Sequence, residues 1–201
     1  MFYLHPHRFK TKAIDASKLL KRYETGKRDF GQVNLTQNSL EDVNLADIKL
    51  WRANLTEINL SRSILHRANL TESNLSGATL WRTDLSYGTL VKAQLDRTLL
   101  IRGNLNHTNL AQSSLMNGDL RLVSLVGANL QGADLSGVNL SYADLSYANL
   151  TGANLERAIL TGTTLTNTNL TNTNLRQTIL EGADLSQAIL QEQDIFARGT
   201  M

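Results

Sequence analysis

A leucine at every fifth position dominates this sequence. From Phe30 to Ile195 each block of five residues ends in an apolar residue, and 32 of these 34 residues are Leu. No insertion or deletion interrupts the spacing. A fixed internal period constrains the fold more strongly than any local feature does, so the rest of the chain is interpreted against it.

A period of five suits neither a single helix nor a flat strand. On an α-helix, residues five apart differ by about 140°, so the Leu side chains would spiral around the axis. On a flat strand, every second Leu would face the wrong side. The chain must therefore turn once in every five residues, which predicts stacked coils and a solenoid.

The other positions of the repeat support this interpretation. The residue two places before each Leu is usually small, as at Ala133 and Ala148. Residues two apart in an extended segment share a face, so large and small side chains can fill a narrow interior together. The residue just before each Leu is mostly Asn or Asp, and the two residues after it are mostly polar or Gly, which suits turns.

The repeat resembles a known family. Residues 133–137 (ADLSG), 143–147 (ADLSY) and 148–152 (ANLTG) match the A(D/N)LxX signature of the pentapeptide-repeat proteins, and the match extends over residues 28–197. This resemblance implies an all-β fold, a right-handed quadrilateral β-helix with about four pentapeptides per coil. With a strand spacing of about 4.8 Å, the repeats would form a rod about 40 Å long.

The N-terminal segment predicts a cap on this rod. Residues 1–12 are expected to form a mobile tail, and residues 13–27 a short capping α-helix. Leu19, Leu20 and Tyr23 give this helix an apolar stripe, and either Asp15 or Ser17 can be its N-cap. A cap is expected because the open end of a solenoid exposes unpaired backbone.

Two further observations concern the N-terminal segment. Residues 19–30 are similar to the entry segment of cyanobacterial members of the family, which implies a regulatory role in the cell. His5 and His7 could hold a metal ion together, but two His residues in a tail are weak evidence, and we predict no metal site.

The C-terminal end offers a different prediction. Too few residues follow Ile195 to form a helix, and residues 198–201 are expected to be a short tail. Family members often pair end to end at this terminus, so the resemblance implies a homodimer with Ile195 and Phe196 as candidate contact residues. Fraying or a local loop over the last coil is the alternative.

Composition limits the classes of function. The chain has no Cys and a single Pro, which lies outside the repeat, so no disulfide or thiolate chemistry is available and every coil can pair. The apolar runs are too short to span a membrane and the N-terminus lacks the apolar stretch of a secretory signal, so we predict a cytoplasmic protein without membrane contact. The formal net charge is +2, but residues 1–30 carry +5 and residues 131–201 carry −4, an asymmetry that can steer partners.

Four-sided coils place residues 20 apart on one face, so surface columns can be derived from the sequence. One such face combines three successive Arg with outward apolar residues for which the core gives no reason. Trp and Arg are favoured in interface cores, and contiguous apolar patches usually mark contacts. The predicted partner-binding residues are Arg62, Trp81, Arg82, Leu99, Ile101, Arg102, Arg121 and Leu122.

A second interpretation of this face stays open. Arg side chains can lie flat over apolar groups, and Glu57, Asp84, Asp96 and Asp119 could form ion pairs with them. The face would then be an ordinary solvated surface. For a neighbouring column, Arg67, Tyr87, His107 and Tyr147, a solvated face is the favoured interpretation.

The sequence shows no catalytic arrangement and implies no cofactor. It has no Gly-rich phosphate loop and no metalloprotease motif. His66 and His107 are predicted to lie about two coils apart, too far to share a metal ion or a proton. Acidic residues occur singly, and a convex rod offers no concave pocket, so we predict that the chain is not an enzyme.

The favoured function is therefore a regulatory scaffold that binds an unidentified protein. The resemblance implies one alternative, because some family members mimic DNA and occupy type II topoisomerases. That role needs an acidic surface, and a pI of about 9.0 disfavours it. Direct nucleic-acid binding through the Arg column is a further alternative, expected to be weak and steeply salt-dependent.

Overall fold

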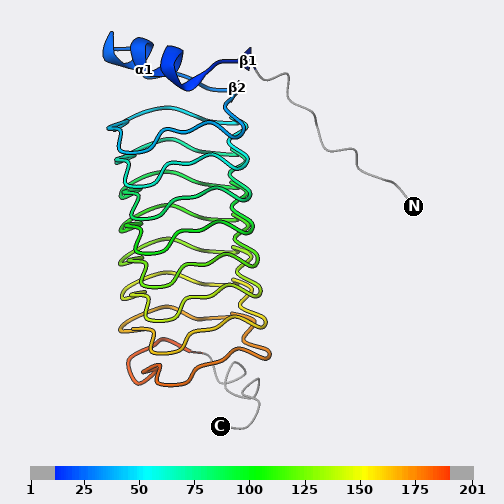
Figure 1. Ribbon diagram of the computed structural model, residues 1–201. Helices are drawn as coiled ribbons and strands as arrows, with labels where there is room; N and C mark the ends of the chain where they lie inside the picture. Colours follow the sequence, from blue (N-terminus) through cyan, green and yellow to red (C-terminus); the bar gives the residue numbers. More distant parts are fainter. Residues whose placement is uncertain (1–11, 191–201) are drawn as a thin grey trace, which may run out of the picture.

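Backbone pairing at a constant offset organises the chain into stacked coils. A computed structural model describes residues 12–190. Parallel bridges join residues 20 apart along the chain, from Asp29↔Lys49 to Asn169↔Ile189. Four pentapeptides therefore complete one coil, and the coils stack into the rod seen in Figure 1. The predicted right-handed quadrilateral β-helix is confirmed.

Backbone hydrogen bonds join successive coils along the rod. The backbone N–H of Leu110 donates to the carbonyl of Asn129 at 2.7 Å, and that of Gln112 donates to Gln131 at 2.9 Å. Within the repeat, the N–H of Ser113 donates back to the carbonyl of Leu110 at 3.1 Å and closes the turn. The same pattern recurs along the rod, so the backbone holds the outer side chains in straight columns.

The second residue after each Leu adopts a left-handed conformation. Its φ is positive in every repeat between Gln32 (59°) and Gly182 (68°). With the hydrogen bond that closes the turn, positive φ at the third residue is the geometry of a type II turn. None of these positions holds Val, Ile or Thr, the residues that tolerate positive φ least. The turn therefore selects the residue types that can form the outer columns.

The interior alternates large and small side chains as predicted. The central Leu residues from Leu35 to Leu175 are buried, and so are Ala residues two positions before them, such as Ala128. Where a hydroxyl replaces this Ala, it bonds to the backbone: Thr83 Oγ1 donates to the carbonyl of Leu60 at 2.8 Å. Within residues 12–190, every buried side-chain nitrogen and oxygen has a hydrogen-bond partner.

The Asn or Asp before each Leu stabilises the following turn. The side-chain oxygen Oδ1 of Asn54 accepts from the backbone N–H of Thr56 at 3.2 Å and from its hydroxyl at 2.7 Å. Asp144 accepts the same two bonds from Ser146. The turn requires a short side chain whose oxygen reaches the backbone N–H two residues later. This requirement explains why Asn or Asp precedes most of the Leu residues.

The N-terminal segment covers the first coil with a strand and a helix. Strand β1 (Lys12–Ala13) pairs in parallel with strand β2 (Val33–Asn34), and helix α1 (Ala16–Glu24) lies across the end of the rod in Figure 1. The helix begins later than the predicted residue 13, because Lys12 and Ala13 extend the ladder as a strand. Asp15 is the N-cap, and its Oδ1 accepts from the N–H of Lys18 at 2.7 Å.

Apolar and polar contacts fix this cap to the rod. Leu19 is fully buried against the core, and Tyr23 packs beside it. The Tyr23 hydroxyl donates to the carbonyl of Ala46 at 2.7 Å, and the Arg28 guanidinium lies 3.9 Å from the centre of the Tyr23 ring. The helix therefore acts as a cover for the first coil.

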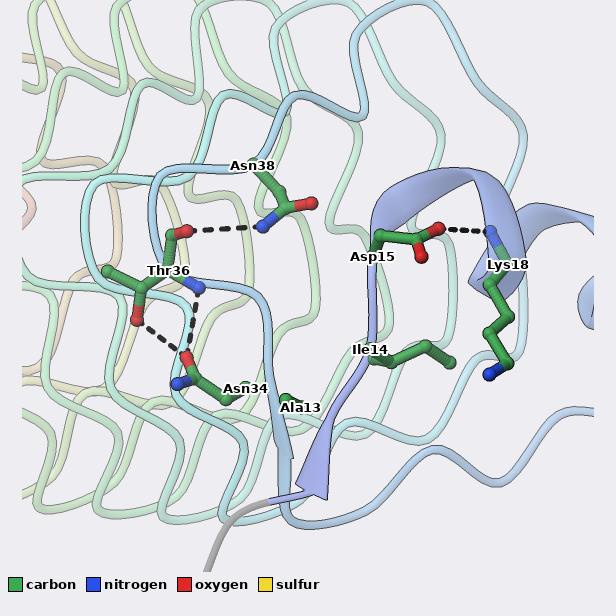
Figure 2. Close-up of a pocket in the computed structure, with 7 residues that line it drawn as sticks. All are labelled: Ala13, Ile14, Asp15, Lys18, Asn34, Thr36 and Asn38. Atoms are coloured by element: carbon green, nitrogen blue, oxygen red, sulfur yellow. Dashed lines mark hydrogen bonds between the residues drawn. The ribbon is translucent and has the colours of Figure 1, made fainter.

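A shallow hollow of about 410 Å³ lies at the seam between the cap and the first coil. Figure 2 shows that the side chains of Asp15, Asn34, Thr36 and Asn38 bond to each other or to nearby backbone. The side-chain oxygen of Asn34 accepts from Thr36, and the Asn38 amide donates to the Thr36 carbonyl. The hollow is thus a packing seam in which the carboxylate, amide and hydroxyl groups are engaged. It is lined by Ala13, Ile14, Asp15, Lys18, Asn34, Thr36 and Asn38.

Several predicted features lie outside the described residues. These are residues 1–11 with His5 and His7, and the candidate dimer contacts Ile195 and Phe196. The predictions about them stay predictions.

Candidate functional site

The coil geometry brings the eight predicted binding residues onto one side of the rod. They form what we call the Arg–Trp patch, defined as Arg62, Trp81, Arg82, Leu99, Ile101, Arg102, Arg121 and Leu122. Backbone pairing sets their register: the N–H of Arg82 donates to the carbonyl of Ile101 at 3.0 Å, and Leu99 is bridged to Thr79 and Asp119. The backbone beneath the patch is therefore fixed by hydrogen bonds between coils and is not a free loop.

Apolar side chains form the middle of the patch. Leu99 and Leu122 are each 47% exposed, and Trp81 and Ile101 are half-buried. Leu99 and Ile101 flank the buried Leu100, so both point outward while Leu100 fills the core. These side chains contribute to the outer surface, and the rod interior does not need them.

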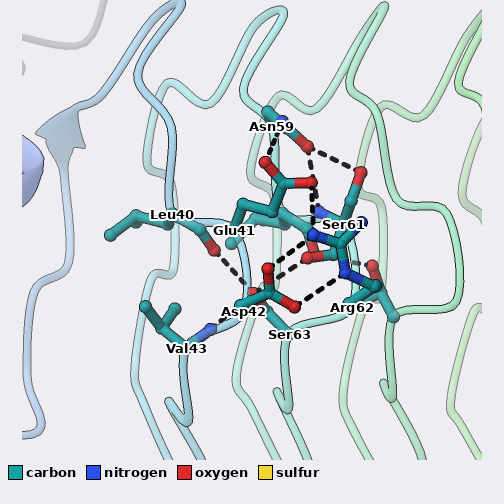
Figure 3. Close-up of polar contacts among 10 residues, drawn as sticks. Leu40, Glu41, Asp42, Val43, Asn59, Ser61, Arg62 and Ser63 are labelled. Atoms are coloured by element: carbon teal, nitrogen blue, oxygen red, sulfur yellow. Dashed lines mark hydrogen bonds and ion pairs between the residues drawn. The ribbon is translucent and has the colours of Figure 1, made fainter.

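Arg62, at the N-terminal edge of the patch, is neutralised within the chain. Figure 3 shows its guanidinium between two acidic side chains of the preceding coil. Its Nη2 lies 2.5 Å from Asp42 Oδ2 and 3.0 Å from Glu41 Oε1. The hydrogen bond from Arg62 holds the pKa of the Asp42 carboxyl below its ordinary value.

Arg121, at the opposite edge, is also paired. Its Nε and Nη2 each donate to a carboxylate oxygen of Asp119 at 2.8 Å. This bidentate bond lowers the pKa of Asp119 and raises that of Arg121. Of the four acidic residues predicted as ion-pair partners of the patch, Asp119 is the one that takes this role.

The other three predicted acidic partners bond elsewhere. Glu57 accepts from the side-chain amide of Gln37, and Asp84 accepts from the backbone of Ser86. Asp96 accepts from the Ser114 hydroxyl. The ion pairs that the alternative interpretation allowed are therefore absent for these three carboxylates, since each bonds in its own turn or in a neighbouring column.

Arg82 and Arg102 consequently keep an unbalanced charge at the centre of the patch. Within residues 12–190, no carboxylate lies within ion-pair distance of either guanidinium. Arg82 lies 5.1 Å from the centre of the Trp81 ring, a cation–π contact that leaves its hydrogen-bond donors available. The patch therefore exposes two unpaired cations, Arg82 and Arg102, beside its apolar side chains.

Sequence reasoning missed the acidic residues that neutralise Arg62. Asp42 lies 20 residues before Arg62 in the same column, and Glu41 stands next to Asp42. The 20-residue spacing could have identified this pair, because it places the two side chains on successive coils. Exposed Ile64, on the adjacent face, was also missed; it replaces the usual Asn or Asp before a Leu.

The neighbouring column is largely engaged in contacts of its own. Arg67 Nε lies 3.0 Å from Asp47, and the Tyr87 and His107 rings stack with centroids 5.0 Å apart. His66 lies between coils with its Nδ1 2.9 Å from the Ser86 hydroxyl. These contacts favour the solvated-face interpretation of this column, although Tyr147 is exposed.

The described part of the chain offers no metal centre. Between residues 12 and 190, no group of three or more His, Cys, Asp or Glu side chains is placed to hold an ion. In the same part of the chain, no helix is long and apolar enough to cross a bilayer.

These observations define a solenoid repeat protein that carries the Arg–Trp patch on its outer surface. A family model for pentapeptide repeats matches in eight copies over residues 29–67, 39–77, 63–100, 104–141, 139–177 and 169–192. The chain belongs to the pentapeptide repeat family.

Several solved structures are similar to the chain. HetL of the cyanobacterium Nostoc sp. strain PCC 7120, which is involved in heterocyst differentiation regulation, shares 28% identity over 89% of this chain and 98% of its own, with a TM-score of 0.42. A pentapeptide repeat protein of the Arabidopsis thaliana thylakoid lumen shares 33% identity over 55% of this chain and 70% of its own, with a TM-score of 0.35. Full-length QnrB1, a plasmid-mediated fluoroquinolone resistance protein, shares 17% identity over 79% of this chain and 96% of its own, with a TM-score of 0.45. Among curated proteins, no match was found.

Proposed function

We propose that this chain is a non-catalytic regulatory scaffold that binds a protein partner through the Arg–Trp patch. One observation carries the proposal: Arg82 and Arg102 have no acidic partner in the described chain, although they lie beside exposed apolar side chains. Desolvated Arg and Trp residues dominate the binding energy of many protein interfaces.

The rigidity of the face supports the proposal. Each patch residue belongs to a repeat that is hydrogen-bonded to the next coil, as between Arg102 N and the carbonyl of Arg121 at 3.0 Å. A partner that binds a pre-ordered surface loses less conformational entropy, so a modest area can bind specifically. The paired Arg62 and Arg121 would form the polar rim around the apolar centre.

A capture experiment tests the proposal. The wild type is compared with the triple variant Trp81→Ser, Arg82→Glu, Ile101→Ser in a lysate of the source organism, after circular dichroism shows that both fold. The matched control is Val91→Ser, Lys92→Glu, Ala111→Ser, which changes the equivalent positions on the opposite face. We expect a protein that the wild type and the control retain and that the patch variant loses.

The opposite result is equally clear. If all three proteins capture the same set, or if none captures a specific protein, the Arg–Trp patch is a solvated surface and the proposed function is wrong.

A further inference from the structure

We infer that the segment bound by the Arg–Trp patch is an acidic amphipathic α-helix that lies along the rod axis. This inference rests on the proposed function, and it specifies the chemistry and shape of the partner. Three properties of the patch carry it: the spacing of its unpaired cations, the position of its apolar side chains, and the neutralisation of its edges.

The spacing of Arg82 and Arg102 favours a helix over a strand. The two residues occupy the same position on successive coils, so their backbone sites lie about 4.8 Å apart along the axis. Helical residues three apart are separated by about 4.5 Å along their axis. Residues on one side of an extended strand are separated by about 6.6 Å. Two carboxylates on successive helical turns therefore match two Arg on successive coils.

Three of the four apolar side chains of the patch precede the Arg column in their repeats, and the fourth, Leu122, continues that column. Leu99 and Ile101 project side by side from one coil, and Trp81 projects from the coil before it. In the repeat, Ile101 directly precedes Arg102, so the apolar strip and the cations run in parallel along the rod. A helix whose acidic residues border an apolar stripe would satisfy both strips at once.

The edges of the patch limit the number of acidic residues required. Arg62 is held by Glu41 and Asp42, and Arg121 by Asp119. Only the two central Arg are left to receive carboxylates from outside. A helix of about three turns, with acidic residues in its middle, has the required length and charge.

A titration with designed peptides tests the inference. The probe is a fluorescein-labelled 18-residue peptide in an Ala/Gln background, with Leu at positions i, i+4 and i+7 and a Glu directly after each Leu. One control peptide replaces every Glu with Lys. A second keeps the composition but places Leu at every second position, and a third carries a central Pro that breaks the helix. Binding to the full chain is measured by fluorescence anisotropy.

We expect the acidic helical peptide to bind the wild type at least tenfold more tightly than each control peptide. The protein variant Arg82→Glu, Arg102→Glu should weaken this binding at least tenfold. The matched variant Lys92→Glu, Arg97→Glu changes the net charge equally, at the same turn position on other faces, and should change binding less than twofold. Equal binding of the period-two or Pro peptide, or no binding of the helical peptide, would overturn the inference.

The two proposals can fail separately. Suppose the capture experiment yields a partner that the patch variant loses, but the acidic helical peptide does not displace it. The proposed function then stands, and the helical partner segment is wrong. If no partner depends on the patch, the proposed function fails.

Discussion

At the scale of single residues, the turn position limits what the surface can be made of. Between residues 32 and 182, the second residue after each central position has a positive φ. Arg, Gln, Tyr and Leu nevertheless occupy many of these positions, as at Arg82, Gln112 and Leu122. For a residue with a side chain this conformation costs about 1–2 kcal/mol relative to the right-handed region. The outer columns thus carry conformational strain that Gly at positions such as Gly132 avoids.

Replacement of Gln112 tests this strain. Gln112→Gly should raise the free energy of unfolding by about 0.5–1 kcal/mol, because relief of strain outweighs the added freedom of the unfolded chain. Gln112→Val should lower it, because a β-branched residue tolerates positive φ least. Urea denaturation measures both. If Val is as stable as Gly at this position, the turn assignment is wrong.

The Arg62–Asp42 pair predicts a pH dependence. The pKa of Asp42 is lowered in the folded chain, so the pair's contribution is present above the ordinary carboxyl pKa of about 4. It is lost as the pH falls through the lower folded pKa. We therefore expect a Tm difference between the wild type and Arg62→Gln at pH 7 that shrinks as the pH is lowered below about 4. A difference that stays constant as the pH falls would mean that the ion pair does not contribute to stability.

At the scale of elements, the cap shows what the sequence could and could not predict. The apolar stripe of Leu19, Leu20 and Tyr23 predicted a helix, which α1 confirms. The pattern could not reveal that Lys12 and Ala13 form a strand, because that strand exists only through pairing with β2, a long-range contact. Nor could it decide whether Asp15 or Ser17 is the N-cap, since both residue types suit the position.

The structure makes that choice testable. Asp15→Ala should lower the free energy of unfolding of the cap by about 1 kcal/mol, because the N–H of Lys18 loses its acceptor. Ser17→Ala should have a much smaller effect, since its hydroxyl donates only to the Asp15 carboxylate. Hydrogen exchange of the amides in α1 measures the difference. Equal effects of the two changes would contradict Asp15 as the N-cap.

At the scale of the whole molecule, the uninterrupted period made the fold predictable. A Leu at every fifth position supplies one large inward side chain per repeat, and the Leu side chains from Leu35 to Leu175 are buried as expected. The sequence did not predict which Arg residues of the patch are neutralised by ion pairs. Sequence columns place Arg82 and Arg102 correctly, but the conformations of Arg62 and Arg121 decide which cations are neutralised. The side-chain conformations of exposed residues cannot be predicted from a sequence pattern.

The shared core predicts that a single interior change affects the rod as a unit. Leu110 lies in mid-rod and is fully buried. Leu110→Asp should unfold the protein, because it places an unpaired charge in the core. Leu110→Met keeps the volume and should cost less than about 1.5 kcal/mol. Circular dichroism with thermal melting compares the two, and an Asp variant that melts like the wild type would refute the inward assignment.

The central claim is that the Arg–Trp patch contacts a protein in the cell. In-cell photocrosslinking tests it most directly, with a benzophenone amino acid in place of Ile101 and, as a control, in place of Ala111 on the opposite face. We predict one dominant crosslinked protein from position 101 that is absent from position 111 and is lost when Arg82→Glu and Arg102→Glu are added. No specific crosslink from position 101, or the same proteins from both positions, would contradict the claim.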